Sequence, residues 1–76
     1  MRFTLSASYK VAGMIGCDPE KDQAILSCVS HRPCDMGSGF GERDVAWYFD
    51  NEEEAEASRD RLNLIEGVKT SLSHEA

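Results

Sequence analysis

Residues 43–67 read RDVAWYFDNEEEAEASRDRLNLIEG and contain the clearest pattern in the chain. Apolar side chains recur at every second position in the first part of this stretch, from Arg43 to Asp50. Val45, Trp47 and Phe49 therefore share one face, and a period of two with β-branched and aromatic residues predicts a half-buried β-strand.

The second part of the stretch predicts a helix. Asn51 is a favourable N-cap residue, and Glu54 three residues later completes a capping-box pattern. Gly67 supplies the left-handed stop at the other end. The expected buried face consists of residues at helical spacing, namely Ala55, Ser58, Leu62 and Ile65.

Two further strands flank this unit at the ends of the chain. Strict alternation of apolar and polar residues from Arg2 to Val11 predicts a first strand. The same alternation from Val68 to Ser73 predicts a last one.

The middle of the chain is less regular. Asp18-Pro19 has the form of an N-cap followed by a proline in the first helical turn, which predicts a helix from residue 18 to residue 30. The apolar run in residues 24–30 is equally compatible with a strand. The glycine-containing stretch after Pro33 predicts an irregular strand that ends in a tight turn at Gly41-Glu42. If residues 18–30 are helical, we expect four of them to be buried: Ala24, Ile25, Cys28 and Val29.

The order strand-helix-strand-strand-helix-strand predicts a single α+β domain over residues 1–76. Its expected form is the ferredoxin-like β-α-β-β-α-β fold, an antiparallel sheet with both helices on one face. If residues 18–30 form a strand instead, the fold becomes an antiparallel meander covered by one helix. A chain of 76 residues buries only about 60% of its unfolded surface, so no second core fits.

Composition narrows the classes of partner. The net charge of −6 repels nucleic acid and anionic membranes and attracts basic protein surfaces. We therefore expect neither direct nucleic-acid binding nor membrane binding. The N-terminus alternates apolar and polar residues and lacks the apolar stretch of a signal peptide, so we expect a cytoplasmic protein.

The acidic residues are concentrated in one segment. Eight acidic and two basic residues lie between Glu42 and Asp60, so this segment accounts for the whole net charge of −6. On a helix, Glu52, Glu56 and Asp60 lie roughly 6 Å apart in a stripe, close to the spacing of successive phosphates along a nucleic-acid strand. The alternative is an ordinary solvated helix face. The predicted partner-binding residues are Glu52, Glu53, Glu56 and Asp60 on the helix, with Asp44 and Tyr48 on the preceding strand.

The chain carries no clear signature of catalysis or cofactor binding. Cys28, His31 and Cys34 lie at three-residue intervals, and Cys17 could complete a zinc site, but the Cys-x₂₋₄-Cys pairs typical of zinc sites are missing. We therefore expect buried thiols, no metal and no other cofactor. The glycines at 37–41 resemble a phosphate loop, but no helix N-terminus follows them. We expect a binding protein rather than an enzyme.

The C-terminal residues Ser73-His74-Glu75-Ala76 resemble the ending of some small phage-encoded anti-CRISPR proteins that act on type I systems. The short length, acidic balance and single domain are also similar to theirs. This resemblance implies binding to the crRNA-guided surveillance complex (Cascade) or to its nuclease. An acidic member would occupy a basic DNA-binding channel as a DNA mimic, in the cytoplasm of the host cell. The alternative is a ferredoxin-like protein-interaction or regulatory domain that dimerises through its sheet. We expect a monomer or a weak dimer.

Overall fold

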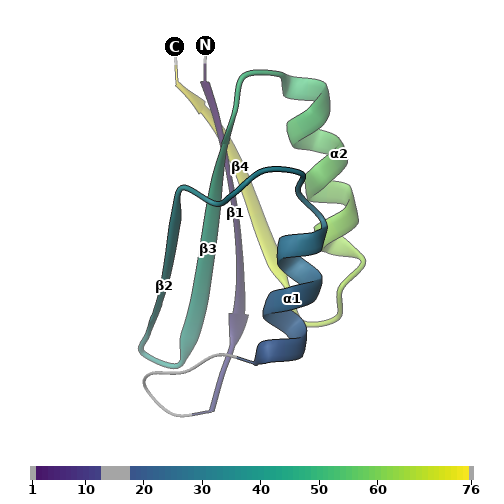
Figure 1. Ribbon diagram of the computed structural model, residues 1–76. Coiled ribbons are helices and arrows are strands. Elements are labelled where there is room, and N and C mark those ends of the chain that lie inside the picture. The colour runs from purple at the N-terminus through teal and green to yellow at the C-terminus, as the bar shows by residue number, and fades with distance from the viewer. Residues whose placement is uncertain (1, 13–17, 76) are drawn as a thin grey trace.

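The fold is shown in Figure 1 by a computed structural model that describes residues 2–12 and 18–75. The predicted β-α-β-β-α-β order and the α+β class are confirmed. The elements are β1 (Arg2–Lys10), α1 (Pro19–Ser27), β2 (Asp35–Gly39), β3 (Glu42–Phe49), α2 (Glu52–Asn63) and β4 (Lys69–Glu75).

The four strands form one antiparallel sheet in the order β2-β3-β1-β4. The first strand therefore lies between the third and the fourth, as in the ferredoxin-like arrangement. Both helices cover the same face of the sheet, as Figure 1 shows. The opposite face carries no element in the part of the chain that is described.

Residues 19–27 are helical, so the alternative with a strand in this segment is wrong. The Asp18 carboxylate accepts hydrogen bonds from the backbone N–H groups of Glu20 and Lys21, at 3.1 and 3.2 Å. This cap and the proline at the first helical position explain why a helix forms here. The helix ends at Ser27, before the predicted end, and Ala24 is exposed rather than buried.

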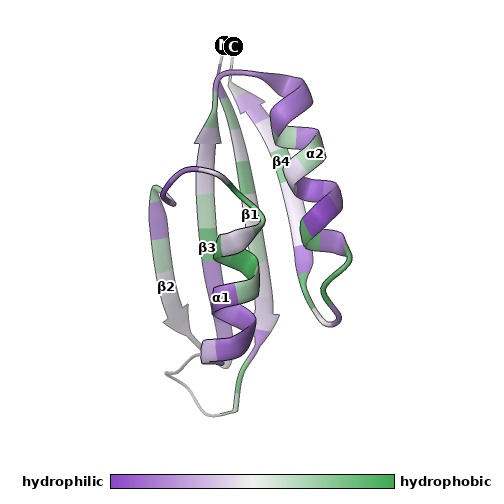
Figure 2. Cartoon of the chain, turned by 45° about the vertical axis from the view of Figure 1, so that its right-hand side comes forward, coloured by the Kyte–Doolittle hydropathy of each residue, from purple (hydrophilic) through white to green (hydrophobic). Residues whose placement is uncertain are grey.

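The core lies between the sheet and the two helices. Alternation along β1 and β3 places one apolar row of each strand against the helices, and Figure 2 shows these alternating bands. Trp47 is completely buried, and its Nε1 atom has no hydrogen-bond partner among the described residues. The buried apolar residues are Phe3, Leu5, Ala7, Tyr9, Ile25, Val29, Val45, Trp47, Phe49, Ala55 and Leu62.

A polar cluster is buried where α1 crosses the end of the sheet. The Tyr9 hydroxyl donates to Asp22 Oδ1, and Arg43 contacts Asp22 Oδ2 through Nη2 at 3.0 Å. Register pairs Tyr9 with Arg43, so both side chains lie on the helix side of the sheet. Arg43 Nη1 also donates to Ser38 Oγ at 3.2 Å. The cluster therefore joins α1 to three strands.

The connection between β2 and β3 is a two-residue hairpin turn. Gly39 pairs with Glu42, so Phe40 and Gly41 are the central residues, with φ of 53° and 79°. Positive φ at both positions is the signature of a type I′ turn, which matches the twist of the flanking strands. The predicted turn at Gly41-Glu42 is displaced by one residue, because the glycine occupies the second central position.

Truncation of a core side chain tests the predicted orientation of α2. Leu62 is fully buried and Glu53 is exposed on the same helix. Leu62→Ala should lower the free energy of unfolding by roughly 2–5 kcal/mol, because it leaves a cavity in a small core. Glu53→Ala is the control and should cost less than about 1 kcal/mol. Urea denaturation measures both, and equal midpoints would contradict the assigned orientation.

Removal of the buried carboxylate tests the polar cluster. Asp22→Ala should lower the free energy of unfolding by about 3 kcal/mol, because the Arg43 guanidinium loses the carboxylate that it contacts. The double variant Asp22→Leu/Arg43→Met replaces the charges with apolar groups and should recover most of this loss. Glu20→Ala on the exposed side of α1 is the control. A double variant less stable than Asp22→Ala would show that the ion pair itself holds α1 in place.

Candidate binding surfaces

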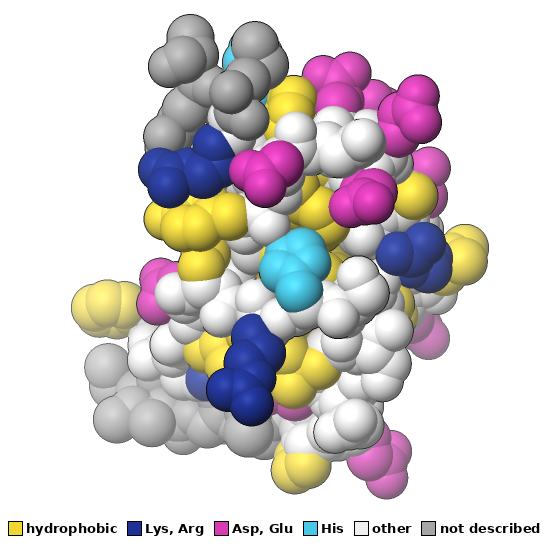
Figure 3. All heavy atoms as spheres, turned by 45° about the horizontal axis from the view of Figure 1, so that its top comes forward, with side chains coloured by type: hydrophobic (Ala, Val, Ile, Leu, Met, Phe, Trp, Pro, Cys, Tyr) yellow, Lys and Arg dark blue, Asp and Glu magenta, His cyan; other side chains and the backbone are white. Residues whose placement is uncertain are grey.

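The first candidate surface is the acidic stripe, which we define as Glu52, Glu53, Glu56 and Asp60 of α2. The apolar side of α2 packs on the sheet through Ala55 and Leu62, so the stripe faces away from the core. Three of its four residues are exposed and Glu56 is half-buried. Acidic side chains gather at the upper right of Figure 3, over α2. The structure therefore brings together the four helix residues predicted from the sequence.

Backbone capping holds the stripe in place. Asn51 Oδ1 accepts a hydrogen bond from the backbone N–H of Glu54 at 3.1 Å, as the capping pattern predicts. Three glutamates occupy the first turn, where the positive end of the helix dipole stabilises them. The high carboxylate density at this end is therefore compatible with a stable helix.

The helix α2 also carries two arginines, and their partners differ. Arg59 Nη2 lies 3.3 Å from Asp60 Oδ1, in an ion pair whose aspartate side chain is 70% exposed. Arg61 donates to the backbone oxygen of Cys28 at 2.9 Å and to Ser58 Oγ at 3.0 Å. Arg61 thus connects α2 to the end of α1 and leaves the stripe acidic.

The other two predicted site residues lie elsewhere. Asp44 and Tyr48 alternate with the buried residues of β3, so their side chains lie on the sheet face opposite the helices. Tyr48 is 45% exposed, and the Arg2 guanidinium lies 4.2 Å from the centre of its ring. The structure therefore does not bring Asp44 and Tyr48 together with the acidic stripe, because the sheet separates them from α2.

The second candidate surface is this open face of the sheet, built from β3, β1 and β4. Register places the side chains in three central rows, each with its β1 residue in the middle. Most of these side chains are small, and hydroxyl groups dominate. The rows, written in the order β3, β1, β4, are Tyr48-Thr4-Ser73, Ala46-Ser6-Ser71 and Asp44-Ser8-Lys69.

Exposure of the thiols differs from the prediction. Cys34 is exposed and Cys28 is half-buried, with its Sγ 3.3 Å from the backbone oxygen of Ala24. His31 Nε2 donates to the backbone oxygen of Tyr48 at 2.7 Å, and its ring packs edge-on against Phe49. Over residues 2–12 and 18–75, no group of three or more His, Cys, Asp or Glu side chains could hold a metal ion. Cys17 lies outside the described residues.

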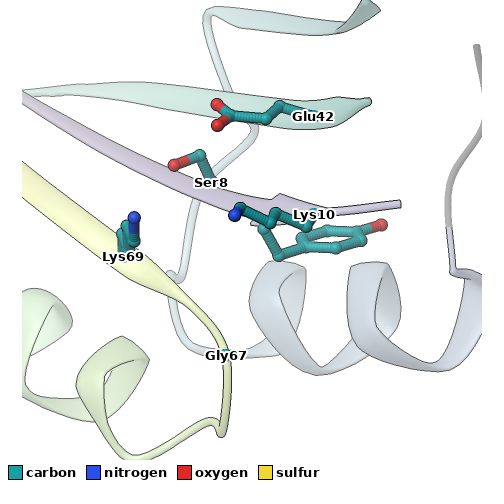
Figure 4. Close-up of a pocket in the computed structure, with 6 residues that line it drawn as sticks. Ser8, Lys10, Glu42, Gly67 and Lys69 are labelled. Atoms are coloured by element: carbon teal, nitrogen blue, oxygen red, sulfur yellow. The ribbon is translucent and has the colours of Figure 1, made fainter. Parts of the chain in front are cut away.

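A small pocket lies at the end of the sheet beside Gly67. Figure 4 shows Lys10 and Lys69 near one another, with Ser8 and Glu42 close by. The cavity volume is about 20 Å³, which accommodates about one water molecule. The pocket is therefore too small for an organic substrate.

The hairpin tip carries a feature that alternation did not predict. Phe40 is 92% exposed and has a φ of 53°, a conformation that costs a bulky side chain roughly 1 kcal/mol. The fold gains no packing from this residue in return. Backbone strain at an exposed aromatic residue marks the tip as a candidate contact point. The Gly39-Phe40-Gly41 sequence was the signal that could have identified it.

A scan against models of known protein families and searches of curated proteins and of solved structures find no match to this chain. Among the described residues, no helix has the length and apolar character needed to cross a membrane.

Replacement of the hairpin aromatic tests the strain. Phe40→Asn creates the Asn-Gly pair favoured in type I′ turns and should raise the free energy of unfolding by about 1 kcal/mol. Leu64→Asn is the control, because Leu64 is 86% exposed but has an ordinary φ of −78°. Its effect should be close to zero. Urea midpoints measure both, and a destabilised Phe40→Asn variant would mean that Phe40 contributes packing to the fold.

Proposed function

We propose that this protein is an anti-CRISPR inhibitor of a type I system that acts as a DNA mimic. It binds a basic DNA-binding surface of the crRNA-guided surveillance complex through the acidic stripe of α2. One observation carries the proposal: Glu52, Glu53, Glu56 and Asp60 line the solvent side of one capped helix whose other side is held in the core. The resemblance of Ser73-His74-Glu75-Ala76 to the ending of some of these inhibitors supports the choice of target.

The mechanism is electrostatic competition. Lysines and arginines that hold the phosphates of target DNA attract the carboxylates of the stripe instead. A helix rise of 1.5 Å per residue sets Glu52, Glu56 and Asp60 roughly 6 Å apart, so that several basic side chains can be engaged at once. Because α2 is packed against the sheet, the backbone that carries the carboxylates is already positioned before binding, which reduces the entropy lost on association.

This function requires no catalysis and no cofactor. The inhibitor acts in the cytoplasm of the host cell, where the complex surveys DNA, and it binds protein rather than nucleic acid. The net charge of −6 supports this division, since DNA repels the chain while a basic channel attracts it.

Charge reversal on the stripe tests the proposal. The triple variant Glu52→Lys/Glu56→Lys/Asp60→Lys should abolish binding to the purified crRNA-guided complex, while far-UV circular dichroism shows an intact fold. Wild-type binding should weaken by at least tenfold between 50 and 200 mM salt, roughly the change expected when several charge pairs form. Competition with target DNA should be complete in a gel-shift assay.

A matched control separates the stripe from net charge. Glu20→Lys/Asp35→Lys/Glu66→Lys makes the same change in net charge at exposed positions outside the stripe. This control variant should retain at least one third of the wild-type affinity. Equal loss in both triple variants, or simultaneous binding of protein and target DNA to the complex, would contradict mimicry by the stripe.

A further inference from the structure

We infer that the open face of the sheet binds a second copy of this chain, in a two-fold dimer whose axis runs along β1. This inference uses residues of the open face and is independent of the function proposed for α2. It rests on the arrangement of charge and side-chain size in the three rows defined above.

A two-fold axis along β1 exchanges the positions of β3 and β4 between the two copies. Asp44 and Lys69 flank Ser8 in one row, on β3 and β4 respectively. In the dimer, Asp44 of each copy therefore faces Lys69 of the other. This one row therefore provides two symmetric ion pairs between the two copies.

The other two rows are complementary in size under the same axis. Tyr48 is the largest side chain of the central rows, and it faces Ser73 of the second copy. Ala46 faces Ser71 in the next row. Small side chains at the centre allow the two sheets to approach closely, and each hydroxyl group can donate and accept a hydrogen bond across the contact.

The charges also select this orientation over the opposite one. An axis across the strands, through the row of Ser6, would place Lys10 of one copy against Arg2 of the other. It would also leave Lys69 opposite Ser73. Both arrangements bring positive residues of β1 together, but only the axis along β1 also forms ion pairs, so this axis is favoured.

Two positive residues lie near the axis at the ends of β1 and limit the strength of the dimer. Lys10 has Glu42 directly opposite it on β3, which balances its charge locally. Arg2 lies over the ring of Tyr48, toward β3 and away from the axis. The axis nevertheless places Lys10 opposite Lys10 and Arg2 opposite Arg2 of the second copy, so both ends of the face weaken the dimer.

The area of the face predicts a weak dimer. Three strands about 4.8 Å apart and nine residues at about 3.3 Å each give roughly 400 Å² per copy, or about 800 Å² in total. Weak and transient complexes bury less than about 1,200 Å². The dimer is thus expected to be weak and to form only at high protein concentration. The helices lie on the outer sides of such a dimer, which leaves both acidic stripes exposed.

Sedimentation velocity from 5 µM to 1 mM tests the dimer. Wild-type protein should change from monomer to dimer over this range. Asp44→Lys and Lys69→Asp should each lower the association constant at least tenfold, because each variant alone places two like-charged pairs across the axis. Far-UV circular dichroism establishes that both variants are folded.

An equimolar mixture of the two single variants is the decisive measurement. In the mixed dimer, the introduced lysine faces the introduced aspartate, while native Asp44 and Lys69 face each other. The association constant should return to within about threefold of wild type. Within each chain the like charges remain, so recovery in the mixture can come only from contact between chains.

Two further variants complete the test. Glu20→Lys on α1 is the control: it should dimerise as wild type does, and it should form fewer mixed dimers with Lys69→Asp than Asp44→Lys does, because only one of the two charge pairs is then attractive. Ser6→Arg places a bulky charge at the centre of the face and should abolish the dimer, which provides an independent test if a charge variant fails to fold. Wild-type protein that stays monomeric at 1 mM, or a mixture of folded single variants that fails to associate, would overturn the inference.

Discussion

Two short helices can cover only one face of a four-stranded sheet, and this constraint governs the rest of the structure. The covered face takes one residue in two from β1 and β3, including Leu5 and Trp47, which are both completely buried. The residues between them must tolerate water, and on β1 they are hydroxyl and basic residues. The alternation of β1 therefore reflects a core that lies on one side of the sheet only. The polar residues of the strand form part of an extensive face that is available for contact.

Because the core lies on one side of the sheet only and is small, polar groups also help to position α1. This helix has nine residues and only Ile25 among its apolar residues is fully buried. The contact of Asp22 with Tyr9 and Arg43 supplies a directional connection between α1 and the end of the sheet. Such clusters are costly to break and specify one arrangement of the partners, because each member is satisfied only in that geometry.

The two candidate surfaces point in opposite directions and differ in character. The stripe of α2 is a dense array of like charge and suits a basic partner. The open face mixes Asp44 and Lys69 with small hydroxyl residues and suits a surface with the same mixture. Because the sheet lies between them, one can be occupied without obstructing the other.

The local sequence determined most of the secondary structure and the buried face of α2. Period-two alternation identified β1 and β3, and Asn51 with the spacing of Ala55, Ser58 and Leu62 identified α2 and its buried side. These features depend on residues that are only a few positions apart in the sequence, so they could be predicted. The grouping of Glu52, Glu53, Glu56 and Asp60 followed from helix geometry alone.

Tertiary structure decided the rest, because it depends on residues far apart in the chain. Only the packing of the helices on the face of β3 that carries Val45, Trp47 and Phe49 shows that Asp44 and Tyr48 lie on the opposite side of the sheet from α2. The pairing of Tyr9 with Arg43, and the meeting of both with Asp22 of α1, requires the β1–β3 register. The alignment of Asp44, Ser8 and Lys69 in one row likewise depends on three strands that are joined only in the folded sheet, since a shift of one residue would move every side chain to the other face.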